Sequence, residues 1–183
     1  AFTVAALSVL SWPAVPQALT LGDPALNYVE STTTIATSGM PTRRQLAKLA
    51  AGRAAVINLA PSDALGSHDD EQAIVEKAGA RYVHVPVDFS RPRHSDLERF
   101  TREMRALAGK QVFVHCQLNM RASVFVFLYR VTELGEDPEL ARDVRCLLAA
   151  DAAGTLGLLD RPASALFEPA TPPGGGAEVQ AGR

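Results

Sequence analysis

The chain has 183 residues, of which 47% are hydrophobic and 21% are charged, and its formal net charge is −2. This length suffices for one domain with a buried core, and the composition excludes collagen, coiled coil and long disorder. The 18 Lys and Arg are balanced by 20 Asp and Glu, so the basic excess typical of proteins bound to nucleic acid or anionic membranes is missing. A local site would therefore have to hold any anionic ligand.

The two ends of the sequence differ in composition from its middle. Residues 1–20 belong to an uncharged run interrupted by prolines, which is similar to the apolar part of an export signal. We therefore expect an exported, periplasmic protein without stable membrane association after signal removal, with a cytoplasmic protein as the alternative. Residues 168–183 are rich in Pro and Gly and predict a disordered tail. A single domain is predicted over residues 21–167; no oligomeric state is predicted.

The middle of the chain alternates between strand-like and helical periodicity. In chain order, the pattern predicts a strand at 32–37, a helix at 42–51, a strand at 54–59, a helix at 69–78, a strand at 81–87, a helix capped by Ser95 and Asp96 and running to Leu107, a strand at 111–115, a helix at 121–134 and a helix at 138–150. Strands that alternate with helices predict an α/β fold, in which a mostly parallel central sheet is flanked by helices on both faces.

Cys116 lies at the turn between the strand predicted at 111–115 and the helix predicted from 121. Ligands of α/β sheets bind beyond the carboxyl ends of the strands, where loop N–H groups and the helix dipole would hold an oxyanion. The same field favours the thiolate form of a cysteine, which is a nucleophile. Arg121 could offer two parallel N–H groups to a phosphate. Cys146, the other cysteine, lies on the apolar side of a predicted helix and is interpreted as a core residue.

The residues around Cys116 resemble the signature of the cysteine-dependent protein tyrosine and dual-specificity phosphatases. That signature is His-Cys, five residues, Arg, then Ser or Thr. Here His115 precedes Cys116, but only four residues separate Cys116 from Arg121, while Ser123 keeps the place of the hydroxyl. Asn119 stands where those loops carry Gly, and Asn is the next most tolerant residue for a left-handed backbone.

The resemblance extends over roughly residues 28–144. It includes the stretches IATSGMPTRRQLAKL, AAVINLAP, RYVHVPVDF and VHCQLNMRASVFVFLYRV. Together they are similar to a bacterial branch of the superfamily with a shortened Cys-x4-Arg loop. The resemblance implies a protein-tyrosine-phosphatase-like fold and hydrolysis of phosphate monoesters, phosphotyrosine or related, on a phosphorylated protein or a small phosphate ester.

The resemblance also implies a role for each site residue. Cys116 would form a cysteinyl-phosphate while Arg121 holds the equatorial oxygens, and no metal or cofactor is expected. The remaining loop residues expected around the substrate are His115, Gln117, Leu118, Asn119, Met120, Ala122 and Ser123. Among them, His115 is expected to orient the loop through backbone contacts, and Ser123 to hydrogen-bond the leaving sulfur. His68, His84 and His94 show no metal-ligand spacing.

A proton donor for the leaving group is expected on the loop after the strand at 81–87. Asp88 directly follows that strand and is the expected general acid. Two alternatives stay open. Asp96 lies at the start of a helix, where capping alone explains it, and Asp63 follows the strand at 54–59.

Two other functions stay open beside the phosphatase. In sulfurtransferases of the rhodanese type the loop also runs Cys, four residues, Arg, and a persulfide on Cys116 would need the same anion site. The Gly-His-Ile-Pro-Gly stretch of rhodaneses, however, is missing from this sequence, and Asp-x-Arg occurs only as Asp143-Val144-Arg145, after the Cys116 loop. A non-catalytic phosphate-binding module is the second alternative, because the short loop could bind a phosphorylated partner without turning it over. Nucleic acid is not an expected partner.

Overall fold

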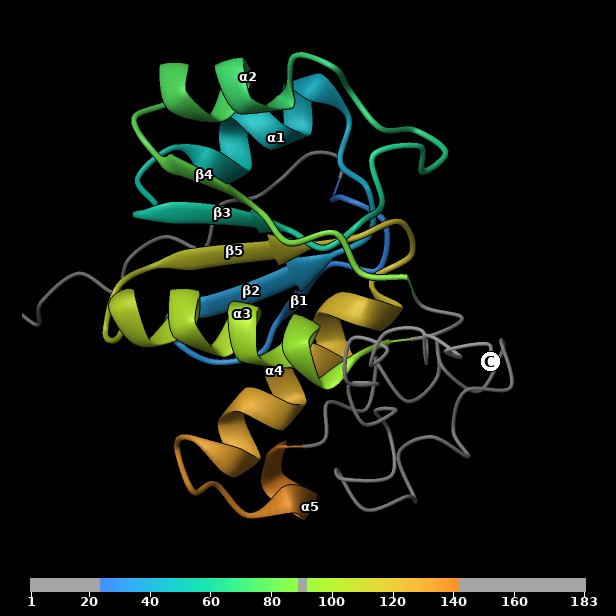
Figure 1. The fold of residues 1–183 in the computed structure, drawn as a ribbon. Helices are drawn as coiled ribbons and strands as arrows, with labels where there is room; N and C mark the ends of the chain where they lie inside the picture. The colour runs from blue at the N-terminus through green and yellow to red at the C-terminus, as the bar shows by residue number, and fades with distance from the viewer. Residues whose placement is uncertain (1–23, 89–91, 142–183) are drawn as a thin grey trace, which may run out of the picture.

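The computed structural model describes residues 24–88 and 92–141. The strands are β1 (Val29–Glu30), β2 (Ile35–Ser38), β3 (Ala55–Asn58), β4 (Arg81–His84) and β5 (Val112–His115). The helices are α1 (Arg43–Ala50), α2 (Glu71–Lys77), α3 (His94–Ala106), α4 (Met120–Thr132) and α5 (Pro138–Ala141). Together these elements form a single α/β layered structure (Figure 1).

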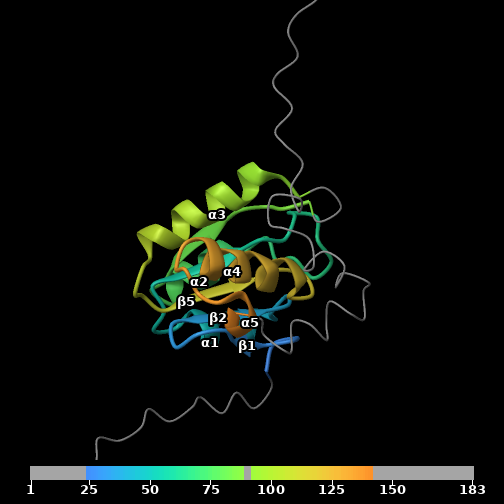
Figure 2. The ribbon, with the colours of Figure 1, turned by 90° about the horizontal axis from the view of Figure 1, so that it is seen from below.

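The five strands form one sheet in the order β1-β2-β5-β3-β4. The pairs β2–β5, β5–β3 and β3–β4 are parallel, and β1 adds an antiparallel edge to β2. Helices α1 and α2 cover one face of the sheet, and α3 and α4 cover the other (Figures 1 and 2). The predicted α/β class with a mostly parallel sheet flanked by helices is therefore confirmed.

Local hydrogen bonds explain where two of the helices begin. Thr42 precedes α1, and its hydroxyl accepts from the N–H of Gln45 while the Gln45 side chain accepts from the N–H of Thr42. This reciprocal capping box satisfies two N–H groups that the first helical turn leaves without partners. At the start of α3 the Asp96 carboxylate accepts from the N–H of Arg93 at 3.0 Å, so capping does explain that residue.

The strand predicted at 32–37 begins later than expected. The hydroxyl of Thr32 accepts from the N–H groups of Thr34 and Ile35, and this local turn competes with strand pairing. The sheet strand therefore begins at Ile35 and extends to Ser38, one residue beyond the predicted end. The short strand β1 had no signal in the sequence, because two residues are too few for a period to be visible.

The strand predicted at 81–87 ends early, at His84. Its continuation still follows β3, since Val85 donates to Asn58 and Val87 donates to Leu59. The two acceptors are adjacent residues although the two donors are two residues apart, so the regular parallel ladder ends here. Pro86 lies between the donors, at a position where an N–H would point away from β3. The chain therefore reaches Asp88 along the same edge of the sheet.

Successive strand residues point to opposite faces of the sheet, which divides the core in two. On the α3/α4 face Ile57, Val112 and Val114 pack with Phe100 and Phe125. On the α1/α2 face the buried apolar residues are Ala25, Ala36, Leu46, Leu49, Ala50, Val56, Val75, Ala80 and Phe113. The tight packing on both faces fixes the ends of the strands that carry the site.

Several predictions fall on residues outside the described ranges. They concern the apolar run 1–20, the tail 168–183, Cys146 and the part of the helix predicted at 138–150 that follows Ala141. Over residues 24–88 and 92–141, no helix combines the length and apolar character needed to span a bilayer.

Candidate active site

Cys116 directly follows β5, at the edge of the sheet where the carboxyl ends of the parallel strands meet. Its side chain is buried, and its N–H donates to the carbonyl of Ser38 at the end of β2. On the other side, the N–H of Leu59 donates to the carbonyl of His115. The base of the loop is thus held by both neighbouring strands.

The loop after Cys116 is fixed to the segment that follows β2. The carbonyl of Gln117 accepts from the N–H of Met40 at 3.0 Å, and Leu118 forms an isolated bridge with Gly39. This contact closes the loop from one side without using the N–H groups of the first turn of α4. The first helical bond of α4 runs from the N–H of Ser123 to the carbonyl of Asn119, and the N–H groups just before it have no partner within the helix.

Two asparagines clamp the loop to the chain before β1. Asn119 has φ of 71° and Asn27 has φ of 51°, both in the left-handed region that few residues other than Gly adopt easily. The side-chain nitrogen of Asn119 donates to the carbonyl of Asn27 at 2.7 Å, and that of Asn27 donates to the carbonyl of Leu118 at 3.1 Å. The left-handed backbone predicted for Asn119 is therefore confirmed, and the two reciprocal bonds stabilise it.

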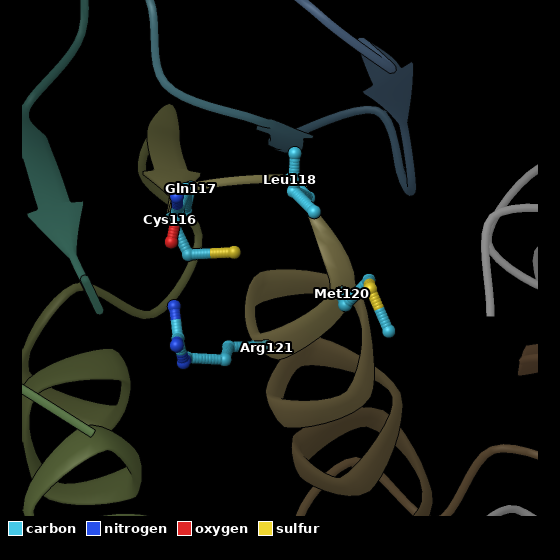
Figure 3. A pocket seen from close by; sticks show the side chains of 5 residues that line it. All are labelled: Cys116, Gln117, Leu118, Met120 and Arg121. Carbon is cyan, nitrogen blue, oxygen red and sulfur yellow. The ribbon is translucent and has the colours of Figure 1, made fainter. Parts of the chain in front are cut away.

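Five residues of this loop line one pocket, namely Cys116, Gln117, Leu118, Met120 and Arg121. In Figure 3 the side chains of Cys116 and Arg121 face the same space, with the guanidinium below the loop, while the Met120 side chain lies farther out. The pocket volume is about 90 Å³, which corresponds to roughly three water molecules. It is far smaller than the ~300–1,000 Å³ pockets that enclose drug-sized ligands, and suits a single small polar group.

The other predicted loop residues lie around this pocket rather than in its wall. Ala122 is buried against the core. The Ser123 hydroxyl donates to the carbonyl of Met120 at 3.0 Å, so in this state it supports the first turn of α4. The ring of His115 belongs to the opposite face of the sheet, where it stacks on Phe113.

The three candidate general acids are also outside the pocket wall. Asp88 is exposed and lies at the same end of the sheet as Cys116. Val87 pairs with Leu59, which in turn pairs with His115. Two strand spacings, roughly 10 Å, therefore separate the backbone at 87–88 from the backbone of the loop. Asp96 caps α3, and Asp63 is exposed in the turns that follow β3.

A buried polar network behind the loop had not been predicted. Oε1 of Glu71, the first residue of α2, lies 2.6 Å from Nε2 of His115, with the two side chains 3% and 0% exposed. Oε2 of Glu71 accepts from Asn58 at 2.7 Å and from Tyr82 at 3.1 Å. Asn58 completes the network by accepting from the N–H of Ala60 at 2.8 Å. Glu71 lies within the helix predicted at 69–78, and no role had been predicted for it.

The network keeps Glu71 ionised. Burial raises the pKa of this carboxyl, but the hydrogen bond and positive charge of His115 lower it, as do the hydrogen bonds from Tyr82 and Asn58. The net result is a pKa below the usual range. Burial and the Glu71 charge together raise the pKa of Tyr82, so its hydroxyl keeps its proton and continues to donate.

The donor set of the site favours an anion over a metal ion. Over residues 24–88 and 92–141, no group of three or more His, Cys, Asp or Glu side chains could hold a metal. The pocket instead presents one thiol and one guanidinium, which are a nucleophile and a partner for oxyanions.

Gly39 provides a test of how tightly the loop is fixed. A Cβ at this position would lie 3.0 Å from the carbonyl oxygen of Gln117 and 3.1 Å from that of Leu26. Both oxygens accept backbone hydrogen bonds and cannot easily move. We expect Gly39→Ala to lower the free energy of unfolding by roughly 1–3 kcal/mol, measured by urea denaturation. An unchanged midpoint would mean that the loop adapts freely.

The chain is similar to several solved structures. No family model matches the sequence, and no curated protein does. Among solved structures, the chain is similar to a candidate phosphatase of the DUF442 family from Shewanella putrefaciens CN-32. The two are 31% identical, the match covers 80% of this chain and 94% of that one, and the TM-score is 0.66.

Two less similar structures share the fold. Tk-PTP in its active form is 24% identical, with 73% of this chain and 96% of that one covered and a TM-score of 0.54. A Cys-to-Ser variant of TpbA from P. aeruginosa, solved in complex with pTyr, is 20% identical, with 76% and 94% covered and a TM-score of 0.51. All of these matches cover nearly the full length of the similar protein.

Proposed function

Because the chain belongs to the DUF442 family, within the superfamily of cysteine-dependent phosphatases of the protein tyrosine phosphatase type, we propose that it hydrolyses phosphate monoesters through a cysteinyl-phosphate on Cys116. The observation that carries this proposal is the shared pocket of Cys116 and Arg121 (Figure 3). A thiolate beneath a tetrahedral anion and a guanidinium beside it are the two groups that such a reaction needs.

The reaction runs in two steps. Sγ of Cys116 bonds to phosphorus as the P–O bond of the ester breaks, and the leaving oxygen takes a proton from Asp88. Water then gives a proton to the Asp88 carboxylate, and its oxygen displaces the sulfur, which releases inorganic phosphate and the thiolate. Arg121 and the loop N–H groups neutralise the equatorial oxygens, where negative charge is greatest.

The wall of the pocket supports an ester with an apolar leaving group, phosphotyrosine or a related aryl phosphate. Leu118 is 48% exposed, and Met120 is half-buried next to the pocket. Apolar surface at the mouth favours an aromatic ring over a charged or hydroxylated group. The small pocket itself has room for little more than the phosphoryl group.

Three assays on the purified chain test this function. Release of phosphate from an aryl phosphate supports the proposal. Cyanide-dependent formation of thiocyanate, without phosphate release, would instead indicate a sulfurtransferase of the rhodanese type. Binding of a phosphotyrosine peptide with no turnover would indicate a phosphate-binding module, and either of these two results would overturn the phosphatase.

Asp88 is expected to be the general acid. Asp88→Asn should slow alkyl phosphates by about 10²–10⁴-fold, while activated aryl phosphates with good leaving groups should lose much less. The reason is that only a poor leaving group needs a proton as its bond breaks. Rates for a series of leaving groups measure this difference.

Asp63→Asn and Asp96→Asn are the matched controls for that series, because each removes one carboxylate at the other candidate positions. Both should retain the dependence on leaving group that the parent shows. If one of them acquires the steep dependence and Asp88→Asn does not, the general acid is that residue instead.

A further inference from the structure

The network behind the loop joins four elements to the residue that precedes the nucleophile. Glu71 comes from α2, Asn58 from β3, Tyr82 from β4 and His115 from β5. Its central contact joins Oε1 of Glu71 and Nε2 of His115 at 2.6 Å, and both side chains are buried. This network lies on the α1/α2 side of the sheet, away from the pocket, and the two-step reaction makes no use of it.

Burying such a polar network costs free energy, so its presence in the core requires compensating contacts. A buried carboxylate is tolerated only when hydrogen bonds and an opposite charge replace the water that it loses. Glu71 has all of these, since it accepts from Asn58 and Tyr82 and lies against the His115 ring. Breaking one partner of such a pair leaves an uncompensated charge, so the four side chains hold one another in a single arrangement.

We propose that Glu71 is a positioning residue for Cys116 and acts through His115. For its effect on turnover, this inference rests on the proposed function. Adjacent residues at the end of a strand point to opposite faces, so the His115 ring is held on one side while Cys116 faces the pocket on the other. By fixing the ring, Glu71 keeps the loop in place before substrate arrives.

The pair restrains the loop through the chain itself. Oε1 of Glu71 lies 2.6 Å from Nε2 of His115, and the peptide bond from His115 to Cys116 passes this restraint to the loop. The loop N–H groups and the start of α4 stabilise a thiolate only while the loop keeps its shape. The pair therefore favours the thiolate only while the Glu71 side chain holds the ring.

Other ionisable groups near the pair do not replace Glu71. Tyr82 stays protonated, and His84 stacks on its ring. Arg53 lies over the ring of Phe113, on which His115 stacks. Asp70, next to Glu71, is exposed and pairs with Arg43 at 2.9 Å.

The first test measures the reactivity of Cys116 itself, without a substrate. The rate of alkylation by iodoacetamide, followed against pH, gives the midpoint at which the reactive thiolate forms. Glu71→Gln should move this midpoint upward by about one pH unit, so that alkylation below the midpoint slows roughly 10-fold. An unchanged or lowered midpoint in the folded variant overturns the proposal, because a loosened loop stabilises the thiolate less and predicts a shift upward.

Asp70→Asn is the matched control, since it removes the same charge one residue earlier but from an exposed pair. Its midpoint should equal that of the parent. Glu71→Asp keeps the carboxylate and should have a midpoint close to that of the parent, with only a small upward shift. Near-UV circular dichroism shows whether Glu71→Gln folds. If it does not, Glu71→Asp and Tyr82→Phe test the proposal instead, and each should shift the midpoint upward by less than about one pH unit. If neither variant shifts the midpoint, the proposal is overturned.

Kinetics supply the second readout. Glu71→Gln should lower kcat for an aryl phosphate about 10-fold with KM changed less than about twofold, because the pocket wall that binds the phosphoryl group is intact. A rise in KM at constant kcat contradicts a positioning role. If the parent hydrolyses no phosphate ester, the proposed function fails while the alkylation midpoints still decide the role of Glu71.

Discussion

Replacing Cys116 by serine is expected to abolish phosphate release, with a fall in kcat of at least about 10³-fold. The hydroxyl occupies nearly the same volume as the thiol, but it does not ionise at neutral pH and is a poor nucleophile. The rest of the pocket should be unchanged by this substitution, because the loop backbone is held by its hydrogen bonds to Met40 and Asn27. The measurement is single-turnover release of phosphate from an aryl phosphate.

Binding should survive the same substitution. The variant should still bind phosphotyrosine peptide, with a Kd within about tenfold of the KM of the parent, since the anion contacts come from the backbone and from Arg121. Mass spectrometry of the quenched parent should detect one phosphoryl group on the peptide that contains Cys116. The same peptide of the variant should carry none.

Cys146→Ser is the matched control for this experiment. It makes the same atomic change at the other cysteine of the chain, which the sequence predicts to be a core residue. Its kcat should be that of the parent. Equal losses in both variants would mean that oxidation or unfolding, rather than loss of a nucleophile, explains the effect.

The periodic spacing of apolar residues along the chain predicted the fold. The periodicity of 42–51 matches α1 because Leu46 and Leu49 face the sheet, and the apolar run before Cys116 matches β5 because both of its faces are buried. The parallel order of the strands follows from helical crossovers between them. Where the prediction was wrong, local hydrogen bonds decided the outcome, as when Thr32 bonded to the backbone and delayed the start of β2.

The pocket could be predicted because its residues are adjacent in sequence. Five consecutive or nearly consecutive residues from Cys116 to Arg121 form its wall, so the spacing of nucleophile and guanidinium already contained the geometry. The clamp by Asn27 lies 92 residues away from Asn119, and no local pattern links the two.

Glu71 was missed for the same reason. An acidic residue at the start of a helix is explained by the helix dipole, and nothing near it in sequence suggests a buried partner. One residue of the network did have a recognisable sequence pattern, because Asn58 is a polar residue at the end of an otherwise apolar strand. A buried polar side chain needs a partner, but identifying that partner required the sheet register.

Arg121→Lys is expected to lower kcat/KM by about 10²–10³-fold although it keeps the positive charge. The guanidinium lines the pocket beside Cys116 (Figure 3) and can donate two parallel N–H groups to two oxygens of the phosphoryl group. An ammonium is a single point of charge that cannot match this geometry. The loss should grow as negative charge moves onto those oxygens, so kcat should fall more than binding of inorganic phosphate does.

Arg130→Lys is the matched control, because it makes the same change on the same helix but in a structural contact. Arg130 donates to Glu136 through two nitrogens and to the carbonyl of Ala141. Its replacement should lower Tm by a few degrees, as expected for a loss of about 1 kcal/mol, and leave kcat/KM unchanged. If instead Arg121→Lys lowers Tm as much as Arg130→Lys does and keeps its activity, Arg121 serves packing of α4 and the anion is held by the backbone of the loop alone.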